Sequence, residues 1–101
     1  MSETIAKLAK IIKTRKSKDI KLSYTSFLLS KGTEYCLNKL KEEVKEFEDA
    51  IKDNKNIEHE GADVIYHLLV SIESAGVNFD KIIEELKSRE GISGFEEKKN
   101  R

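Results

Sequence analysis

Five carboxylates in two short groups are the residues of this sequence best suited to chemistry. Glu42, Glu43 and Glu46 form a Glu-Glu-x-x-Glu pattern, and Glu60 and Asp63 follow as Glu-x-x-Asp. Residues three apart on a helix lie on the same side, about 4.5 Å apart along the axis. The spacing therefore predicts two acidic pairs, each presented by one helix.

A short polar connection, residues 53–56, separates the two groups and predicts that their helices pack antiparallel. Facing carboxylates repel one another and raise one another's pKa unless a cation compensates their charge. Carboxylate oxygens are ligands that Mg²⁺ and Mn²⁺ prefer. The sequence lacks the Glu-x-x-His pattern of di-iron bundles, which disfavours iron. Mg²⁺ sites usually join carboxylates to substrate phosphates, so phosphate chemistry is the natural interpretation. The alternative is a solvated helix face in a chain that is 38% charged.

The elements that carry these acids belong to an expected all-α bundle of about five helices, with no strand. Proline is absent, and the five glycines fall between segments of helical periodicity. Thr33, Asn56 and Asn78 are expected to cap the third, fourth and fifth helices. The expected helices cover about 3–16, from 23 or 25 to 31, 34–52, 56–75 and 78–90.

Apolar side chains predict which faces of the two acidic helices pack. The third helix has a heptad-like seam, and the fourth has an apolar face on its C-terminal side. We expect both faces to lie in helix contacts. The residues concerned are Leu37, Leu40, Val44, Phe47 and Ile51 in the third helix, and Ile65, Leu68, Leu69 and Ile72 in the fourth.

Length predicts a single domain over residues 1–101, with residues 91–101 as a tail or loop. A chain of this size buries a thin core, so we expect homo-oligomerisation to complete the bundle. Basic and acidic residues balance at 19 each, which argues against a nucleic-acid partner. The balance hides an asymmetry, because residues 1–41 carry ten basic and three acidic side chains.

The expected location is the cytoplasm. Cys36 is the one cysteine and cannot form an internal disulfide. The N-terminal residues carry Lys or Arg where a signal peptide needs an apolar run. No stretch approaches the ~20 apolar residues of a membrane span, so no membrane partner is expected.

The acidic signature resembles the EExxE…ExxD motif of the MazG-like all-α nucleoside triphosphate pyrophosphohydrolases. Flanking segments are similar, more narrowly, to the phosphoribosyl-ATP pyrophosphatase family of histidine biosynthesis. The similarity runs from about Ile5 to Arg101. The segments that carry it are Ser23-Tyr24-Thr25 with Leu28-Leu29 and Gly32, Ala62-Asp63-x-x-Tyr66-His67-Leu68-Leu69, and Ser93-Gly94…Glu97-Lys98…Arg101.

The resemblance implies Mg²⁺-dependent hydrolysis of phosphoribosyl-ATP to phosphoribosyl-AMP and diphosphate by a homodimer, the second step of histidine biosynthesis. A carboxylate would orient or deprotonate the water that attacks the α–β phosphoanhydride. Glu42 would be an additional acid, available to a second ion or to that water. The implied metal ligands are Glu43, Glu46, Glu60 and Asp63. The implied substrate-binding residues are Ser23, Tyr24, Thr25, Lys31, Arg89, Lys98 and Arg101.

Other interpretations remain open at this level. A MazG-like house-cleaning pyrophosphatase would keep the metal site and act on ordinary or damaged nucleoside triphosphates. A non-enzymatic helical dimer would leave the acids solvated. The apolar surroundings of Tyr66 and His67 favour packing for both residues. If the resemblance holds, a separate cyclohydrolase is expected to carry out the next step of the pathway.

Overall fold

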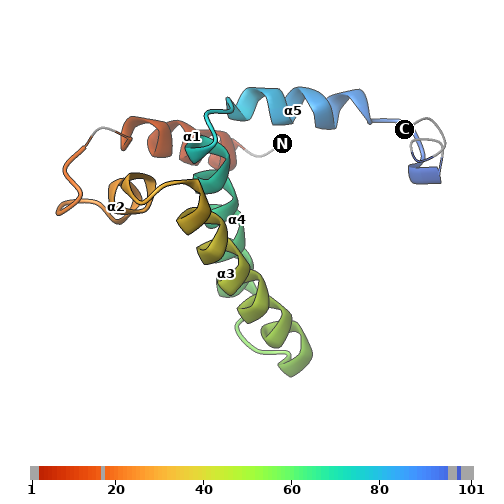
Figure 1. Cartoon of the computed structure of the whole chain (residues 1–101). Coiled ribbons are helices and arrows are strands. Elements are labelled where there is room, and N and C mark those ends of the chain that lie inside the picture. Colours follow the sequence, from red (N-terminus) through yellow and green to blue (C-terminus); the bar gives the residue numbers. More distant parts are fainter. Residues whose placement is uncertain (1–2, 17, 96–97, 99–101) are drawn as a thin grey trace.

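Five helices and no strand make up the part of the chain that the structure, a computed structural model, describes: residues 3–16, 18–95 and 98. The all-α prediction is confirmed, with helix boundaries close to those expected (Figure 1). None of the described helices is both long and apolar enough to cross a membrane. The helices are α1 (Glu3–Thr14), α2 (Tyr24–Ser30), α3 (Thr33–Asp53), α4 (Ile57–Ser74) and α5 (Phe79–Ser88).

A tight turn folds α3 and α4 into an antiparallel hairpin (Figure 1). Asn54 and Asn56 both adopt left-handed backbone conformations, with φ of 53° and 59°, which asparagine tolerates better than most residues. The Lys55 N–H donates to the Ala50 carbonyl at 3.0 Å and closes the end of α3. Asn56 stands at the start of α4, but its side chain forms no capping hydrogen bond, contrary to expectation. The antiparallel packing itself is as predicted.

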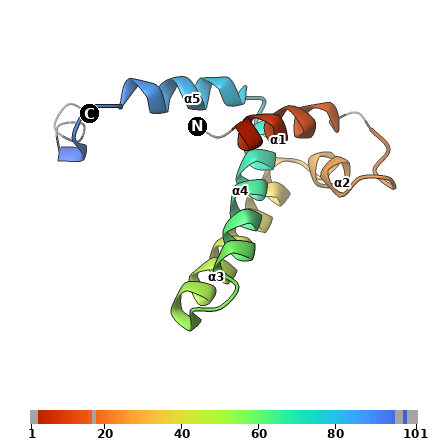
Figure 2. The same cartoon turned by 180° about the vertical axis from the view of Figure 1, so that it is seen from behind.

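The core lies where α1 and α2 cover the C-terminal half of α4 and the first turns of α3 (Figure 2). Ile12 from α1, Leu28 from α2, Cys36 from α3 and Val70 from α4 are all at most 1% exposed. Burying four such side chains removes them from water at one junction, which is the main favourable term in folding. This junction holds one end of the hairpin and leaves the turn end free of α1 and α2.

Side-chain caps fix the starts of α2 and α5, and Thr33, like Asn56, does not form the predicted capping hydrogen bond. The Ser23 hydroxyl accepts from the Ser26 N–H at 3.1 Å, and the Asn78 side chain accepts from the Asp80 N–H at 2.9 Å. Gly32, not Thr33, occupies the position before α3. The Thr33 hydroxyl instead donates to the Ser74 carbonyl at 3.1 Å, because the start of α3 lies beside the end of α4.

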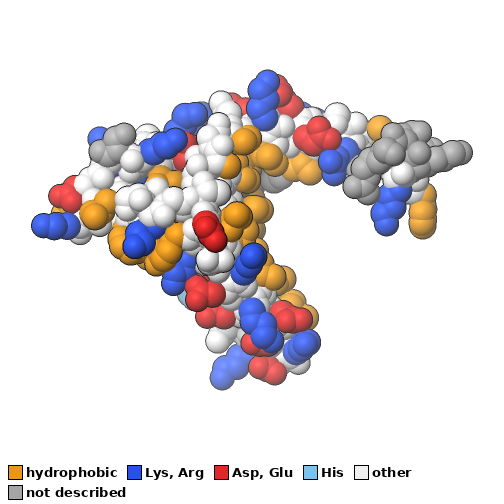
Figure 3. All heavy atoms as spheres, in the orientation of Figure 1, with side chains coloured by type: hydrophobic (Ala, Val, Ile, Leu, Met, Phe, Trp, Pro, Cys, Tyr) orange, Lys and Arg blue, Asp and Glu red, His pale blue; other side chains and the backbone are white. Residues whose placement is uncertain are grey.

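A band of apolar side chains stays exposed on one side of the hairpin, which we call the apolar face. It consists of Leu37, Val44 and Ile51 on α3 and Ile65 and Leu68 on α4, each 40–49% exposed. These residues were expected in helix contacts, but within this chain they cover no core. Figure 3 shows apolar side chains along this side of the hairpin and under α5, which projects away from the end of α4.

Candidate active site

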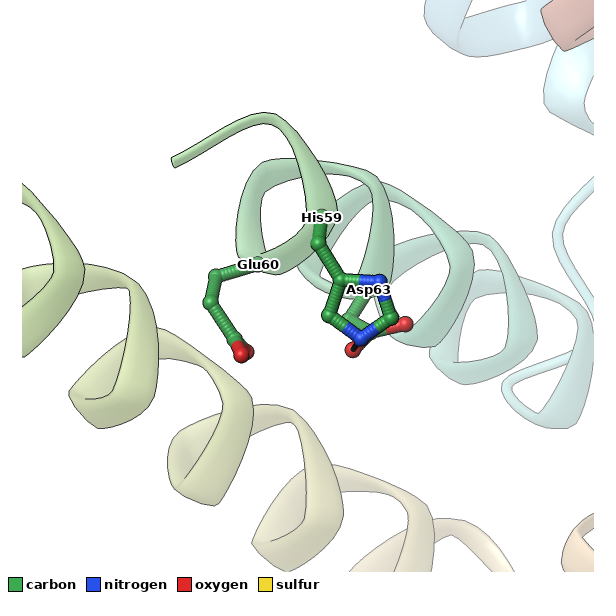
Figure 4. Close-up of side chains that lie close together, drawn as sticks. All are labelled: His59, Glu60 and Asp63. Carbon is green, nitrogen blue, oxygen red and sulfur yellow. Dashed lines mark ion pairs between the residues drawn. The ribbon is translucent and has the colours of Figure 1, made fainter. Parts of the chain in front are cut away.

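The predicted carboxylates meet between facing turns of α3 and α4. One carboxylate oxygen from each of Glu43, Glu46 and Glu60 lies within 4.8 Å of the others. A second group with the same spacing contains Glu60, Asp63 and one ring nitrogen of His59. Figure 4 shows these three α4 side chains pointing to the same side, with Glu60 extended toward α3. Glu60 belongs to both groups, so they form one continuous cluster, which we call the carboxylate cluster.

Two oxygens of the carboxylate cluster are buried without a hydrogen-bond partner: Oε2 of Glu43 and Oε2 of Glu60. An unpartnered buried carboxylate oxygen is costly, because it has lost water and gained no donor. A divalent cation would compensate both oxygens at once. The donor set of hard carboxylate oxygens suits Mg²⁺ or Mn²⁺. The residues present therefore fit such an ion.

Burial and the neighbouring acids both raise the pKa of Glu43. Burial raises the pKa of Glu43 from 4.5 to about 7, and a hydrogen bond with Glu46 and the charges of Glu46, Asp63 and Glu60 add to the increase. Without a cation, the cluster therefore holds a proton near neutral pH. A metal ion would take the place of that proton.

Glu42 lies outside the carboxylate cluster. Its side chain is 62% exposed and forms an ion pair with Lys39, whose Nζ lies 3.3 Å from the Glu42 carboxylate. The structure thus separates Glu42 from the other four predicted acids.

The Ser23-Tyr24-Thr25 segment reaches α4 next to the cluster. The Thr25 hydroxyl is hydrogen-bonded to the Tyr66 hydroxyl, which joins α2 to α4. The Tyr24 ring is about half exposed and lies edge-on to His67, with ring centroids 6.3 Å apart. Ser23 uses its hydroxyl to cap α2. Tyr24 is the member of this segment that keeps a broad exposed surface beside the site.

Two lysine ammonium groups lie over the ring of Tyr35. Lys31 Nζ lies 5.3 Å and Lys39 Nζ 5.7 Å from the centre of the Tyr35 ring, within the range of cation–π attraction. Lys31 was predicted to bind substrate and Lys39 was not. The sequence signal was the spacing, because Lys39 precedes Glu42 by three residues, and residues three apart on a helix lie side by side.

Two further predicted substrate-binding residues, Arg89 and Lys98, lie away from the carboxylate cluster. Arg89 follows α5 and forms an ion pair with Glu85, at 3.1 Å, at the end of α5 that points away from the hairpin (Figure 1). Lys98 is exposed beyond it. Arg101 lies outside the described residues. Within one copy of the chain, the structure does not bring Arg89 to the carboxylate cluster.

Sequence reasoning gave neither histidine of this region a place in the site, although the packing expected for His67 agrees with its burial. His59 Nε2 lies 3.4 Å from Asp63 Oδ2, and His67 Nε2 lies 3.8 Å from Glu43 Oε1. Burial lowers the pKa of His67, which is 5% exposed as a whole residue. The signal was present in the spacing, because His59, Asp63 and His67 follow one another at intervals of four and so share one face of α4.

Comparison with known proteins identifies the family. Residues 5–90 match the sequence profile of the phosphoribosyl-ATP pyrophosphohydrolase family, and the chain belongs to that family. No solved structure matches the chain significantly.

Individual relatives agree along nearly the whole chain. A phosphoribosyl-ATP pyrophosphatase of Dechloromonas aromatica is 39% identical over 98% of this chain and 94% of its own length. One of Dinoroseobacter shibae is 42% identical over 96% of this chain and 97% of its own length. The histidine biosynthesis bifunctional protein HisIE of Wolinella succinogenes is 43% identical over 86% of this chain, which corresponds to 39% of that protein. The family resemblance inferred from the sequence is confirmed.

The raised pKa of Glu43 predicts how the metal-free protein responds to pH. Its folded-state pKa of about 7 exceeds the ordinary 4.5, so the folded state binds more protons than the unfolded state between these values. The free energy of unfolding should therefore fall as pH rises from about 4.5 to 7. Glu43→Gln should flatten this fall and raise the melting temperature of the metal-free protein at pH 8.

Calorimetry in a chelating buffer across this pH range tests the expectation. Glu48→Gln is the matched control, because Glu48 is an exposed α3 acid that is ion-paired with Lys45 and Lys52. Equal slopes of melting temperature against pH in the unsubstituted protein and Glu43→Gln would contradict it.

Proposed function

We propose that this chain hydrolyses phosphoribosyl-ATP to phosphoribosyl-AMP and diphosphate, the second step of histidine biosynthesis. The observation that carries the proposal is the similarity to phosphoribosyl-ATP pyrophosphatases at about 40% identity over nearly the full length of both chains. The carboxylate cluster supports the reaction class, since phosphoanhydride hydrolysis by acidic residues relies on a divalent cation. A role of this kind also favours the cytoplasm as its location.

The proposal includes Mg²⁺, or Mn²⁺, held by Glu43, Glu46, Glu60 and Asp63. When bound, the cation would neutralise charge on the polyphosphate and lower the pKa of a water molecule. Two of these acids have a buried unpartnered oxygen, which supports their place in the metal site. The expectation that a separate cyclohydrolase carries out the next step stays a prediction.

The chain's own residues supply access, orientation and a proton acceptor. A cavity of about 280 Å³ opens beside the cluster and is bordered by Glu46 and Glu60. Water can therefore reach the exposed carboxylate of Glu46, which would orient the water or accept its proton. Glu42 faces solvent one helical turn earlier and remains the candidate for a second ion. The exposed ring of Tyr24 and the ammonium groups of Lys31 and Lys39 lie on the α2 side, where they suit the base and phosphates of a nucleotide.

The decisive experiment is product analysis with purified protein and Mg²⁺. Phosphoribosyl-ATP, ATP and deoxynucleoside triphosphates are incubated in parallel, and diphosphate is measured. We expect diphosphate and phosphoribosyl-AMP from phosphoribosyl-ATP alone. Diphosphate from only the ordinary triphosphates would identify a house-cleaning pyrophosphatase instead, and no product from any substrate would favour a non-enzymatic bundle.

Removing a single cluster carboxylate should remove activity and leave the fold intact. Glu46→Gln and Asp63→Asn each delete one charged ligand, and because the cation supplies several kcal/mol of transition-state stabilisation, we expect turnover to fall by ~10³-fold or more. Circular dichroism should stay unchanged, since both side chains reach solvent. Glu48→Gln, on the same helix as Glu46, should keep full activity. Normal turnover in either cluster variant at saturating Mg²⁺ would exclude that residue from the site.

We also propose that the chain is a homodimer through the apolar face. Five large apolar side chains, each 40–49% exposed, lie on this face of the hairpin. Two of them, Val44 and Ile51, border a groove of about 450 Å³ together with Phe47. Contiguous exposed apolar surface of this kind usually marks an interface, and two-fold pairing of identical hairpins would form a four-helix bundle. The carboxylate cluster lies on the other side of the α3–α4 seam, so such pairing leaves it open.

Placing a charge on the apolar face should break the dimer. Val44→Asp buries an unpaired carboxylate if the face is an interface, so light scattering during size-exclusion chromatography should show a mass of about half that of the unsubstituted protein. Asn38→Asp adds the same charge to an exposed α3 position off this face and should leave the mass unchanged. A monomeric unsubstituted protein, or a dimeric Val44→Asp variant, would refute this interface.

A further inference from the structure

His67 is the one buried imidazole beside the carboxylate cluster among the described residues. Its side chain is 7% exposed, and its Nε2 lies 3.8 Å from Oε1 of Glu43, across the seam between α4 and α3. The other oxygen of the same carboxylate, Oε2, is buried without a hydrogen-bond partner. The two oxygens of Glu43 therefore face different surroundings.

A carboxylate that holds a metal through one oxygen needs its other oxygen fixed, because free rotation of the group would scatter the ligand position. The His67–Glu43 separation is about 0.8 Å longer than a usual N–H···O hydrogen bond, and such contacts commonly tighten when the ligand binds. A small side-chain movement of Glu43 would close it. An imidazole with its proton on Nε2 has the donor that this geometry requires.

Neighbouring aromatic rings fix the orientation of His67. The Tyr66 ring lies edge-on to it at 5.0 Å and the Tyr24 ring at 6.3 Å. Tyr66 is itself tied to α2 by the hydrogen bond with Thr25. The imidazole is thus enclosed by rings from α2 and α4, and its Nε2 is directed at α3.

We propose that His67 is a positioning residue that donates a hydrogen bond from Nε2 to Oε1 of Glu43 and so directs Oε2 of Glu43 at the metal ion. This inference rests on the proposed metal site and adds a function for a residue that touches neither substrate nor metal. It also gives Tyr24 and Thr25 a structural role, because they hold the imidazole in place.

The test measures Mn²⁺ affinity by electron paramagnetic resonance of the free ion, with no substrate present. His67→Phe keeps a ring between the tyrosines but has no donor, and we expect its affinity to fall about 10- to 100-fold. His67→Gln has an amide N–H near the position of Nε2 and should recover most of that loss. His67→Leu also removes the donor but has a smaller side chain. It replaces His67→Phe in the comparison if the phenylalanine variant does not fold.

Ser71→Ala is the matched control, since Ser71 is buried on the same helix one turn farther from the acids. It should bind Mn²⁺ as the unsubstituted protein does. Unchanged affinity in the folded variants without a donor, affinity in His67→Gln as low as theirs, or an equal loss in Ser71→Ala would each overturn the positioning role. Those results would leave the proposed function standing. Failure of the unsubstituted protein to bind Mn²⁺ would overturn both this inference and the metal site.

Discussion

Mutual repulsion among carboxylates is the constraint around which this structure is arranged. Glu43, Glu46 and Glu60 place oxygens within 4.8 Å of one another, and two of the three have a buried oxygen with no donor. Folding brings these groups together at a cost that only a proton or a cation can offset. The hairpin tolerates the cluster because the core at its other end, around Leu28 and Val70, holds α3 and α4 in register.

Helix geometry places the acidic side chains and the exposed apolar side chains of the hairpin on different sides of α3. The exposed apolar residues of α3 recur at intervals of seven, at Leu37, Val44 and Ile51, and so form a stripe along one side of the helix. Glu43 precedes Val44 by one residue, which turns it about 100° away, toward α4 and the carboxylate cluster. The same seven-residue repeat of α3 therefore presents the apolar stripe on one side and the acids on another. A second chain that packs on the stripe would leave the carboxylate cluster exposed.

Much of this arrangement could be predicted from local signals. Helical periodicity, together with glycine and asparagine near the helix ends, predicts the five helices. The spacing of the acids predicts the carboxylate cluster. Two features depend on information outside the local pattern. An apolar seam does not specify whether it packs on its own chain or on another, so Val44 and Ile51 were expected in contacts that this chain alone does not supply. The direction of α5, and with it the position of Arg89, depends on the connection that follows α4, where Gly76 has a φ of 77°. Helical periodicity does not predict that direction.

If the chain has the proposed function, charge also constrains the order in which the cation and the nucleotide bind. A triphosphate approaching the carboxylate cluster meets several acids of its own sign, whereas Lys31 and Lys39 lie over the Tyr35 ring, and Lys39 is ion-paired with Glu42, outside the cluster. The lysines can attract a polyphosphate to the α2 side of the hairpin, but they cannot reverse the charge of the cluster. On the proposed function, a divalent cation held by the acids would offset this repulsion and let the reacting phosphates lie near Glu46 and Glu60. On this view the carboxylate cluster would bind the cation before the nucleotide or together with it, and Lys31 and Lys39 would contact the anion.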